Sequence, residues 1–182
     1  MAIDLFLVIP PAPTNPPIKG EPIRDPYMRQ KFSQAVVTHI RGFSLSAEQT
    51  LNIGSQSTGA GAGKIQFNPL VIERTVDQLT PFLLSMEASG HALDKVQLYV
   101  RKGDARDGQA YLAFEFQLVA VGNISWSGAG ADDLPTEHVA LQYGSLTVGY
   151  HAQNADGTWA GVTKQGWDRV RNIRASGDTI AF

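Results

Sequence analysis

The chain has 182 residues, 43% of them hydrophobic, which is enough to bury the core of one domain. Its 15 Lys and Arg against 17 Asp and Glu give a net charge of −2, so the chain lacks the basic excess of a nucleic-acid-binding protein. It contains no cysteine, which excludes disulfides, thiolate metal ligands and a thiol nucleophile.

The first predicted element is a strand in the N-terminal segment MAIDLFLVI, residues 1–9. This apolar run contains Asp4, has no basic region before it and leads into prolines, so it does not have the pattern of a signal peptide. No segment reaches 18 uninterrupted apolar residues, and no membrane insertion is expected. We therefore expect a soluble protein that is made in the cytoplasm without a signal peptide.

Residues 10–32 form a proline-rich insertion after this strand. Because proline fixes its own backbone torsion and restricts the residue before it, we expect an extended loop without helix or sheet pairing. The insertion is interpreted as a surface excursion between two strands, and a docked partner-recognition segment is the alternative.

A glycine-rich stretch, GSQSTGAGAGKI, covers residues 54–65 and ends close to a lysine, as a phosphate-binding loop would. The P-loop pattern fails, because Thr58 stands where glycine is needed and Ile65 where a hydroxyl is needed. The sequence after it, KIQFNPLVI, predicts a strand and not the helix that a phosphate site requires. No nucleotide cofactor is predicted.

One helix is predicted after residue 78, from an apolar stripe with helical spacing. Thr80 suits the N-cap, Pro81 the first helical position and Gly90 the stop. The predicted core positions of this helix are Leu79, Phe82, Leu83 and Met86.

The rest of the chain alternates as strands do. Residues 96–101 place Val96, Leu98 and Val100 inward, and in residues 138–150 the inward set slips at Gly144 and Ser145, where we predict a β-bulge. Residues 111–121 place Glu115 and Gln117 on the outer face, and their predicted inward set is Leu112, Phe114, Phe116, Leu118 and Ala120. The chain is thus predicted to be mainly β: one domain, residues 1–182, folded as a β-barrel or rolled β-sandwich with one flanking α-helix.

No motif carries catalytic chemistry, so the protein is predicted not to be an enzyme and to have no cofactor or metal site. His39, His91, His138 and His151 are scattered without metal-ligand spacing. The acidic cluster ADDLPTEH, residues 131–138, could bind a hard cation but is typical of solvated turn charges. A group of basic and aromatic residues near the C-terminus favours an exposed surface or protein interface over nucleic acid: Lys164, Arg169, Arg171, Arg174, Trp159 and Trp167.

Several segments in order resemble the haemolysin-coregulated protein family, which forms the tube of the bacterial type VI secretion system. They are MAIDLFLVI, DQLTPFLLSMEASG, VQLYVRKG, QAYLAFEFQLVAVGNIS, LPTEHVALQYGSLTVGY and KQGWD. The resemblance implies a tail-tube-like barrel subunit that assembles as a homohexameric ring. The rings would stack into a hollow tube that a contractile sheath drives out of the cell, with a spike protein at its tip and effector proteins in its lumen. Assembly in the cytoplasm would then be followed by secretion through the apparatus itself.

In that family a long loop between early strands helps one ring meet the next, and residues 50–63 occupy the corresponding place here. The resemblance therefore implies a ring-stacking role for Asn52, Gly54, Ser55, Gln56, Ser57, Thr58, Gly59, Gly61, Gly63 and Lys64.

The insertion at residues 10–32 and the C-terminal tail, residues 169–182, depart from the family pattern. Three alternatives stay open: a specialised effector carrier, a phage-type tail tube protein and a small β-barrel hydrolase.

Overall fold

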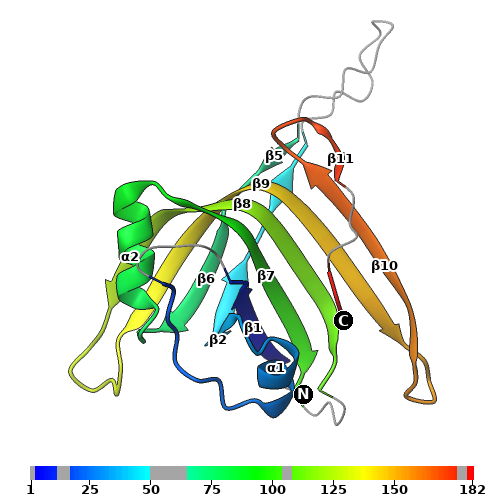
Figure 1. The fold of residues 1–182 in the computed structure, drawn as a ribbon, viewed down its shortest axis with the longest axis horizontal. Coiled ribbons are helices and arrows are strands. Elements are labelled where there is room, and N and C mark those ends of the chain that lie inside the picture. Colours follow the sequence, from blue (N-terminus) through cyan, green and yellow to red (C-terminus); the bar gives the residue numbers. More distant parts are fainter. Residues whose placement is uncertain (1–2, 12–16, 50–64, 104–107, 176–179) are drawn as a thin grey trace, which may run out of the picture.

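The computed structural model describes residues 3–11, 17–49, 65–103, 108–175 and 180–182 (Figure 1). The first strands and both helices of this part are β1 (Ile3–Ile9), α1 (Pro26–Lys31), β2 (Val36–Ile40), β3 (Gly42–Ser44), β4 (Ala47–Glu48), β5 (Gln66–Phe67), β6 (Leu70–Thr75) and α2 (Thr80–Ser89). The later strands are β7 (Ala92–Lys102), β8 (Ala110–Ser127), β9 (Thr136–Gln153), β10 (Trp159–Asp168) and β11 (Ile173–Ala175).

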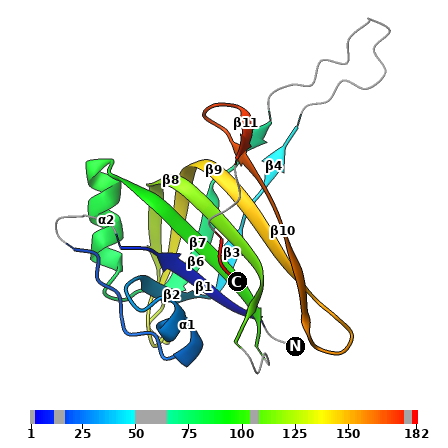
Figure 2. The same cartoon turned by 45° about the vertical axis from the view of Figure 1, so that its right-hand side comes forward.

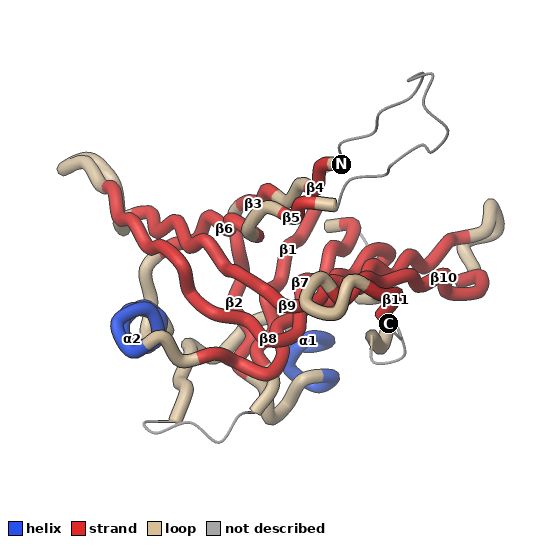
Figure 3. Tube along the Cα trace, turned by 90° about the horizontal axis from the view of Figure 1, so that it is seen from above, coloured by secondary structure: helices blue, strands red, loops and turns tan. Residues whose placement is uncertain are grey.

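The sheet closes on itself as a barrel. Its strands run in the order β2–β1–β7–β8–β9, all antiparallel, and β6 pairs with the first part of β9. β3 pairs with β6 and follows β2 after a single residue, Arg41, whose backbone N–H donates to the Glu73 carbonyl at 2.7 Å. The segment 36–44 thus joins the two ends of the sheet, and Figure 3 shows the strands curving round with α2 at their side. The predicted mainly β barrel with a flanking helix is confirmed.

β9 changes its partner on one edge. Residues 136–141 pair with β6, and residues 145–153 pair with β10, while β8 follows the other edge of β9 from Thr136 to Tyr150. The second part of β9 therefore leaves the barrel, together with β10 and β11. We call residues 145–175 the wing; Figure 2 shows β10 and β11 lying apart from the barrel strands.

The face of β8 that points into the barrel also changes, close to the point where β9 exchanges its partner. Leu118 on β8 has a positive φ of 52° and is 59% exposed, so the buried residues after Phe116 are Val119 and Val121. The predicted inward positions of Leu118 and Ala120 are therefore wrong, because one left-handed residue turns the strand over. Phe116 and the residues before it on β8 keep their predicted face.

The register shift that we expected at Gly144 and Ser145 lies elsewhere. Gln117 pairs with Ser145 and Val119 with Tyr143, so the register is the same on both sides of Gly144. The shift occurs on β8, between Val121 and Asn123. Gly144 marks the point where β9 exchanges β6 for β10, and its carbonyl accepts the Arg169 N–H at 3.0 Å.

The insertion contains a helix, which corrects the prediction of an extended loop. Asp25 caps α1 by accepting the Met28 N–H at 2.9 Å, and Pro26 stands at the start of the helix, where its missing N–H costs nothing. Met28 is buried in a second apolar cluster outside the barrel, against Phe6, Val8 and Tyr99. The outer face of β1 and β7 is therefore covered as well.

α2 begins one residue away from its predicted cap. Leu79 is the N-cap and makes no side-chain cap bond, while Asp77 accepts the Leu79 N–H at 2.7 Å. Gly90 ends the helix in the left-handed conformation, as expected. In the part of the chain that the structure describes, neither helix is long and apolar enough to cross a membrane.

Candidate assembly surfaces

In the sequence, the predicted stacking loop connects β4 and β5, which pair as a short ribbon. The ribbon pairs Ala47 with Phe67, and Asn68 fixes its base by donating from its backbone N–H to the Ser46 carbonyl at 3.0 Å. The loop residues themselves, Asn52, Gly54, Ser55, Gln56, Ser57, Thr58, Gly59, Gly61, Gly63 and Lys64, lie outside the described residues. Their stacking role stays a prediction.

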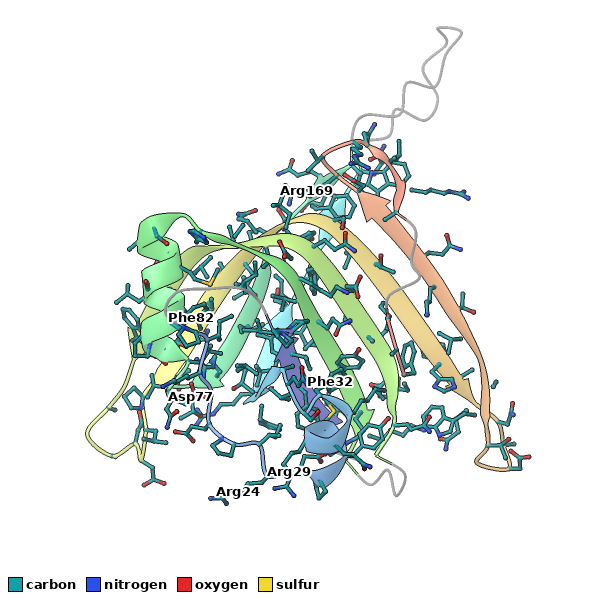
Figure 4. All side chains as sticks on the ribbon, in the orientation of Figure 1. Arg24, Arg29, Phe32, Asp77, Phe82 and Arg169 are labelled. Atoms are coloured by element: carbon teal, nitrogen blue, oxygen red, sulfur yellow. The ribbon has the colours of Figure 1, made fainter. Side chains whose placement is uncertain are left out.

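Tyr143 links this ribbon to the wing. Its hydroxyl donates to the Asn68 carbonyl at 3.0 Å, and its ring meets Phe67 edge-on with centroids 6.3 Å apart. The Arg169 guanidinium lies 5.3 Å from the same ring, and Figure 4 places Arg169 at this end of the molecule. Burial raises the pKa of Tyr143, so the neutral hydroxyl is the form present here. The base of the predicted loop and the β9–β10 junction are thus one packed unit.

The wing carries apolar side chains that the chain itself leaves exposed. They are Tyr150, Val162, Val170 and Ile173. They are spread over β9, β10, the turn after β10 and β11, and Tyr150 and Val162 lie on opposite faces of the ribbon, since Tyr150 pairs with Thr163 and Val162 with His151.

Part of the wing is covered by residues 180–182. Lys164 donates to the Ile180 carbonyl at 2.7 Å, and His151 meets the Phe182 ring with centroids 5.3 Å apart. Ile180 is buried in the outer apolar cluster. These residues extend that cluster towards β10 but leave the end of the wing around residues 169–174 open.

Beside the apolar contacts of Met28, ion pairs of Arg101 hold the insertion to the barrel. Arg101 on β7 bonds Asp4 at 2.7 Å and Asp25 at 2.6 Å, and its guanidinium lies 5.0 Å from the Phe6 ring. Burial tends to raise the pKa of Asp25, but the bonds from Arg101 and from the Met28 N–H outweigh it and hold the pKa below its ordinary value. A groove of about 810 Å³ runs between the insertion, β2 and residues 75–77.

A buried ion pair stands where we expected solvated turn charges. Arg74 on β6 and Glu137 on β9 are both fully buried, with 2.5 Å between Nη1 and Oε2. Glu137 also accepts the Trp126 indole N–H at 2.8 Å, and Arg74 contacts Asp77 before α2. Glu137 is therefore committed to neutralising Arg74, and it does not join Asp132 and Asp133 at a cation site.

The other candidate residues stay apart. His39 packs edge-on against Phe6, and His151 packs against Trp159. Within residues 3–11, 17–49, 65–103, 108–175 and 180–182, no group of three or more His, Asp or Glu side chains could hold a metal ion. Sequence reasoning missed Arg74 and the Tyr143–Arg169 contact, because both depend on strand register and not on a local pattern.

Comparison with known proteins agrees with the fold. A family model described as "Type VI secretion system effector, Hcp" matches residues 18–150. The protein hcp1 of Pseudomonas aeruginosa is 31% identical over 113 residues, which are 62% of this chain and 70% of that protein.

Solved structures share the same fold at lower identity. A type six secretion system protein superposes with a TM-score of 0.79 at 23% identity, covering 96% of this chain and 100% of the other. Hcp1 from Salmonella typhimurium gives a TM-score of 0.65 at 23% identity, with 96% and 100% covered. A type VI secretion system effector from Yersinia pestis gives 0.60 at 19% identity, with 91% and 99% covered.

Proposed function

The chain belongs to the Hcp family of type VI secretion system proteins, and from that premise we propose that it is the ring-forming subunit of a secretion tube. Six copies form a closed ring, and the rings stack into a hollow tube. The role is structural and not catalytic.

The wing is the observation that carries the ring. The barrel encloses an apolar core, whereas the wing extends from it as a ribbon with Tyr150 and Val162 exposed, one on each face. A surface of this kind, present once per subunit and meeting a different surface on its neighbour, gives a head-to-tail contact that closes into a ring when the rotation per subunit allows it.

The loop at residues 50–63 is proposed to join one ring to the next. The residues at the base of this loop, Phe67 and Asn68, contact Tyr143 on β9. A force on the loop would therefore be transmitted to the barrel. Deleting Gly54–Gly63 should abolish stacking and leave the rings and the barrel intact. Unchanged stacking would contradict this role.

The remaining partners follow from the family. We propose that the tube meets a spike protein at its tip and a contractile sheath around it, that effector proteins travel in its lumen, and that it leaves the cell through the apparatus.

A specialised effector carrier is the second candidate, because the insertion adds α1 and a groove to the barrel. Loss of export of one effector after deletion of residues 11–28, with tubes intact, would favour it.

A phage-type tail tube protein has the same architecture as a secretion tube subunit. The genes that lie beside the gene for this chain would distinguish these two alternatives. The hydrolase alternative needs a turnover that disappears on changing Asp132, Glu137 or His138, and Glu137 is already bound to Arg74.

The native mass in solution tests the ring. Light scattering coupled to size exclusion, at two protein concentrations, should show a discrete species of about six subunits, as expected for closed point-group symmetry. A species that stays monomeric at both concentrations would contradict the ring.

A further inference from the structure

The turn between β10 and β11 combines positive charge with exposed apolar side chains. Residues 169–174, which we call the basic tip, contain Arg169, Arg171 and Arg174, with Val170 68% exposed and Ile173 52% exposed. The backbone of the tip is defined, because Asn172 takes a left-handed φ of 58° and the Arg171 N–H donates to Asp168 Oδ1 at 2.8 Å. Arginine is enriched at protein interfaces, and the apolar side chains beside it are stabilised when a partner removes them from water.

A hollow with acidic side chains beside it lies in the connection between β8 and β9. It has a volume of about 390 Å³, is lined by Trp126, Asp132 and Pro135 among others, and belongs to residues 126–135, which we call the acidic hollow. Trp126 is 46% exposed and Leu134 is 53% exposed, and Asp133 stands exposed between Asp132 and Leu134.

The acidic hollow is held in shape by its own contacts. The Trp126 indole donates to Glu137, whose other oxygen is held by the buried Arg74. Asp132 accepts the Ala129 N–H at 2.8 Å and so closes the turn. A surface that is ordered before binding loses little conformational entropy when a partner arrives.

The basic tip and the acidic hollow lie at opposite ends of the molecule, the tip at the top and the β8–β9 connection at the bottom in Figures 1 and 2. A subunit therefore cannot fill its own hollow with its own tip. Subunits that follow one another in the same orientation place the end that carries the tip against the end that carries the hollow, as rings stacked head to tail do.

We propose that the basic tip of a subunit in one ring docks in the acidic hollow of a subunit in the next ring. The inference rests on the proposed function, since it names the surfaces that join stacked rings. Arg171 and Arg174 pair with Asp132 and Asp133, and a guanidinium can also stack on the face of Trp126. Val170 and Ile173 are covered by Trp126 and Pro135, which line the hollow.

The test is a charge exchange between the two surfaces. The tip variant carries Arg171→Glu and Arg174→Glu, and the hollow variant carries Asp133→Arg, which spares the turn that Asp132 holds. Arg24→Glu with Arg29→Glu, on and beside α1, is the control, because these exposed arginines belong to neither surface. Sedimentation and electron microscopy measure stacked rings, light scattering measures single rings, and melting temperatures check the fold.

Each variant should reduce the stacked fraction by about tenfold or more at moderate salt, with rings intact, and the control should not. The combined variant should recover most of the stacking, because the exchanged charges attract again. Stacking unchanged in both single variants would overturn the inference and leave the proposed function standing. Rings that fall apart into monomers would also overturn it, since the contact would then lie within a ring. A wild-type protein that forms no rings would overturn the proposed function itself.

Discussion

The barrel and the wing are built from the same long strands, yet they differ in what covers them. Leu98 and Val139 in the barrel are fully buried by other parts of the chain, and the outer face of β1 and β7 is covered by α1. On the wing, Tyr150, Val162 and Ile173 stay exposed. The comparison teaches that the barrel holds its own shape, whereas the wing has little of the burial that stabilises most sheets, and under the proposed function a neighbouring subunit supplies it.

The sequence of the wing fits this division. β10, with the sequence WAGVTKQGWD, contains Gly161 and Gly166, and glycine within a strand adds no side chain to pack and weakens the strand. We therefore expect changes in the barrel to affect folding and changes in the wing to affect assembly.

Loss of the buried ion pair should have the largest effect on the barrel. Glu137→Ala leaves the buried Arg74 charge with Asp77 but without Glu137, and the free energy of unfolding should fall by about 3 kcal/mol, the lower end of the cost of breaking a buried pair. Chemical denaturation measures the change. Glu73→Ala, on the same strand as Arg74 but only half-buried, should lower it by less than about 1 kcal/mol. Equal losses in the two variants would contradict the role of the pair.

A matched pair of apolar truncations tests the comparison directly. Leu98→Ala opens a cavity in the barrel core and should lower the free energy of unfolding by about 2–5 kcal/mol. Val162→Ala on the wing should lower it by no more than about 0.5 kcal/mol, because this side chain is 39% exposed in the single subunit. Ring formation, measured by light scattering, should be weakened by Val162→Ala. A large loss of stability in that variant would show that the wing is part of the folding core.

A methyl group at Gly166 should loosen the wing alone. Its Cβ would lie 2.4 Å from Thr147 Oγ1 and 3.0 Å from the Leu146 carbonyl oxygen, so β10 must move away from β9. We expect a local destabilisation of about 1–3 kcal/mol, seen as faster hydrogen exchange in β10 and β11 with barrel protection unchanged. Gly161→Ala is the control, because a Cβ there meets no described atom within 4 Å. Faster hydrogen exchange in the barrel strands as well would contradict the separation of the wing from the barrel.

The attachment of α1 should show the smallest effect, and it should depend on pH. Asp25→Ala removes the helix cap and the bond to Arg101, which should lower the free energy of unfolding by about 0.5–2 kcal/mol. The pKa of Asp25 is lowered in the folded protein, so its contribution is present above the ordinary pKa and is lost as the pH falls through the lowered value. The difference between wild type and Asp25→Asn should therefore shrink as the pH falls below about 5, through the ordinary carboxyl pKa and on to the lowered pKa of Asp25. A difference that stays constant would contradict the ionic part of the contact.

Much of the barrel could be predicted because the alternation of apolar and polar residues along a strand is a local signal. Val96, Leu98 and Val100 are buried as expected, since β7 stays extended there. The prediction failed from Leu118 onward, where a single residue with positive φ reverses the face, and alternation cannot show such a residue. α1 was missed although Asp25-Pro26 is a recognisable helix start, because the many prolines around it favoured a loop.

The assembly surfaces were less predictable for a physical reason. Arg74 and Glu137 are 63 positions apart, and they meet through the register of β6 and β9, which no local pattern contains. The basic residues near the C-terminus were predicted to form an exposed surface, but the complement that we propose for them, in residues 126–135, depends on which end of the barrel each loop occupies.

The exchange of partners along β9 has a mechanical consequence. β9 has 18 residues, which at about 3.3 Å per residue makes a strand of roughly 60 Å, and β8 follows it on one edge from Thr136 to Tyr150. A pull or push along this strand loads its rows of hydrogen bonds in parallel, so they must yield together and not one after another. A load applied at the wing is thereby carried into the barrel through covalent chain, without crossing any hinge between them.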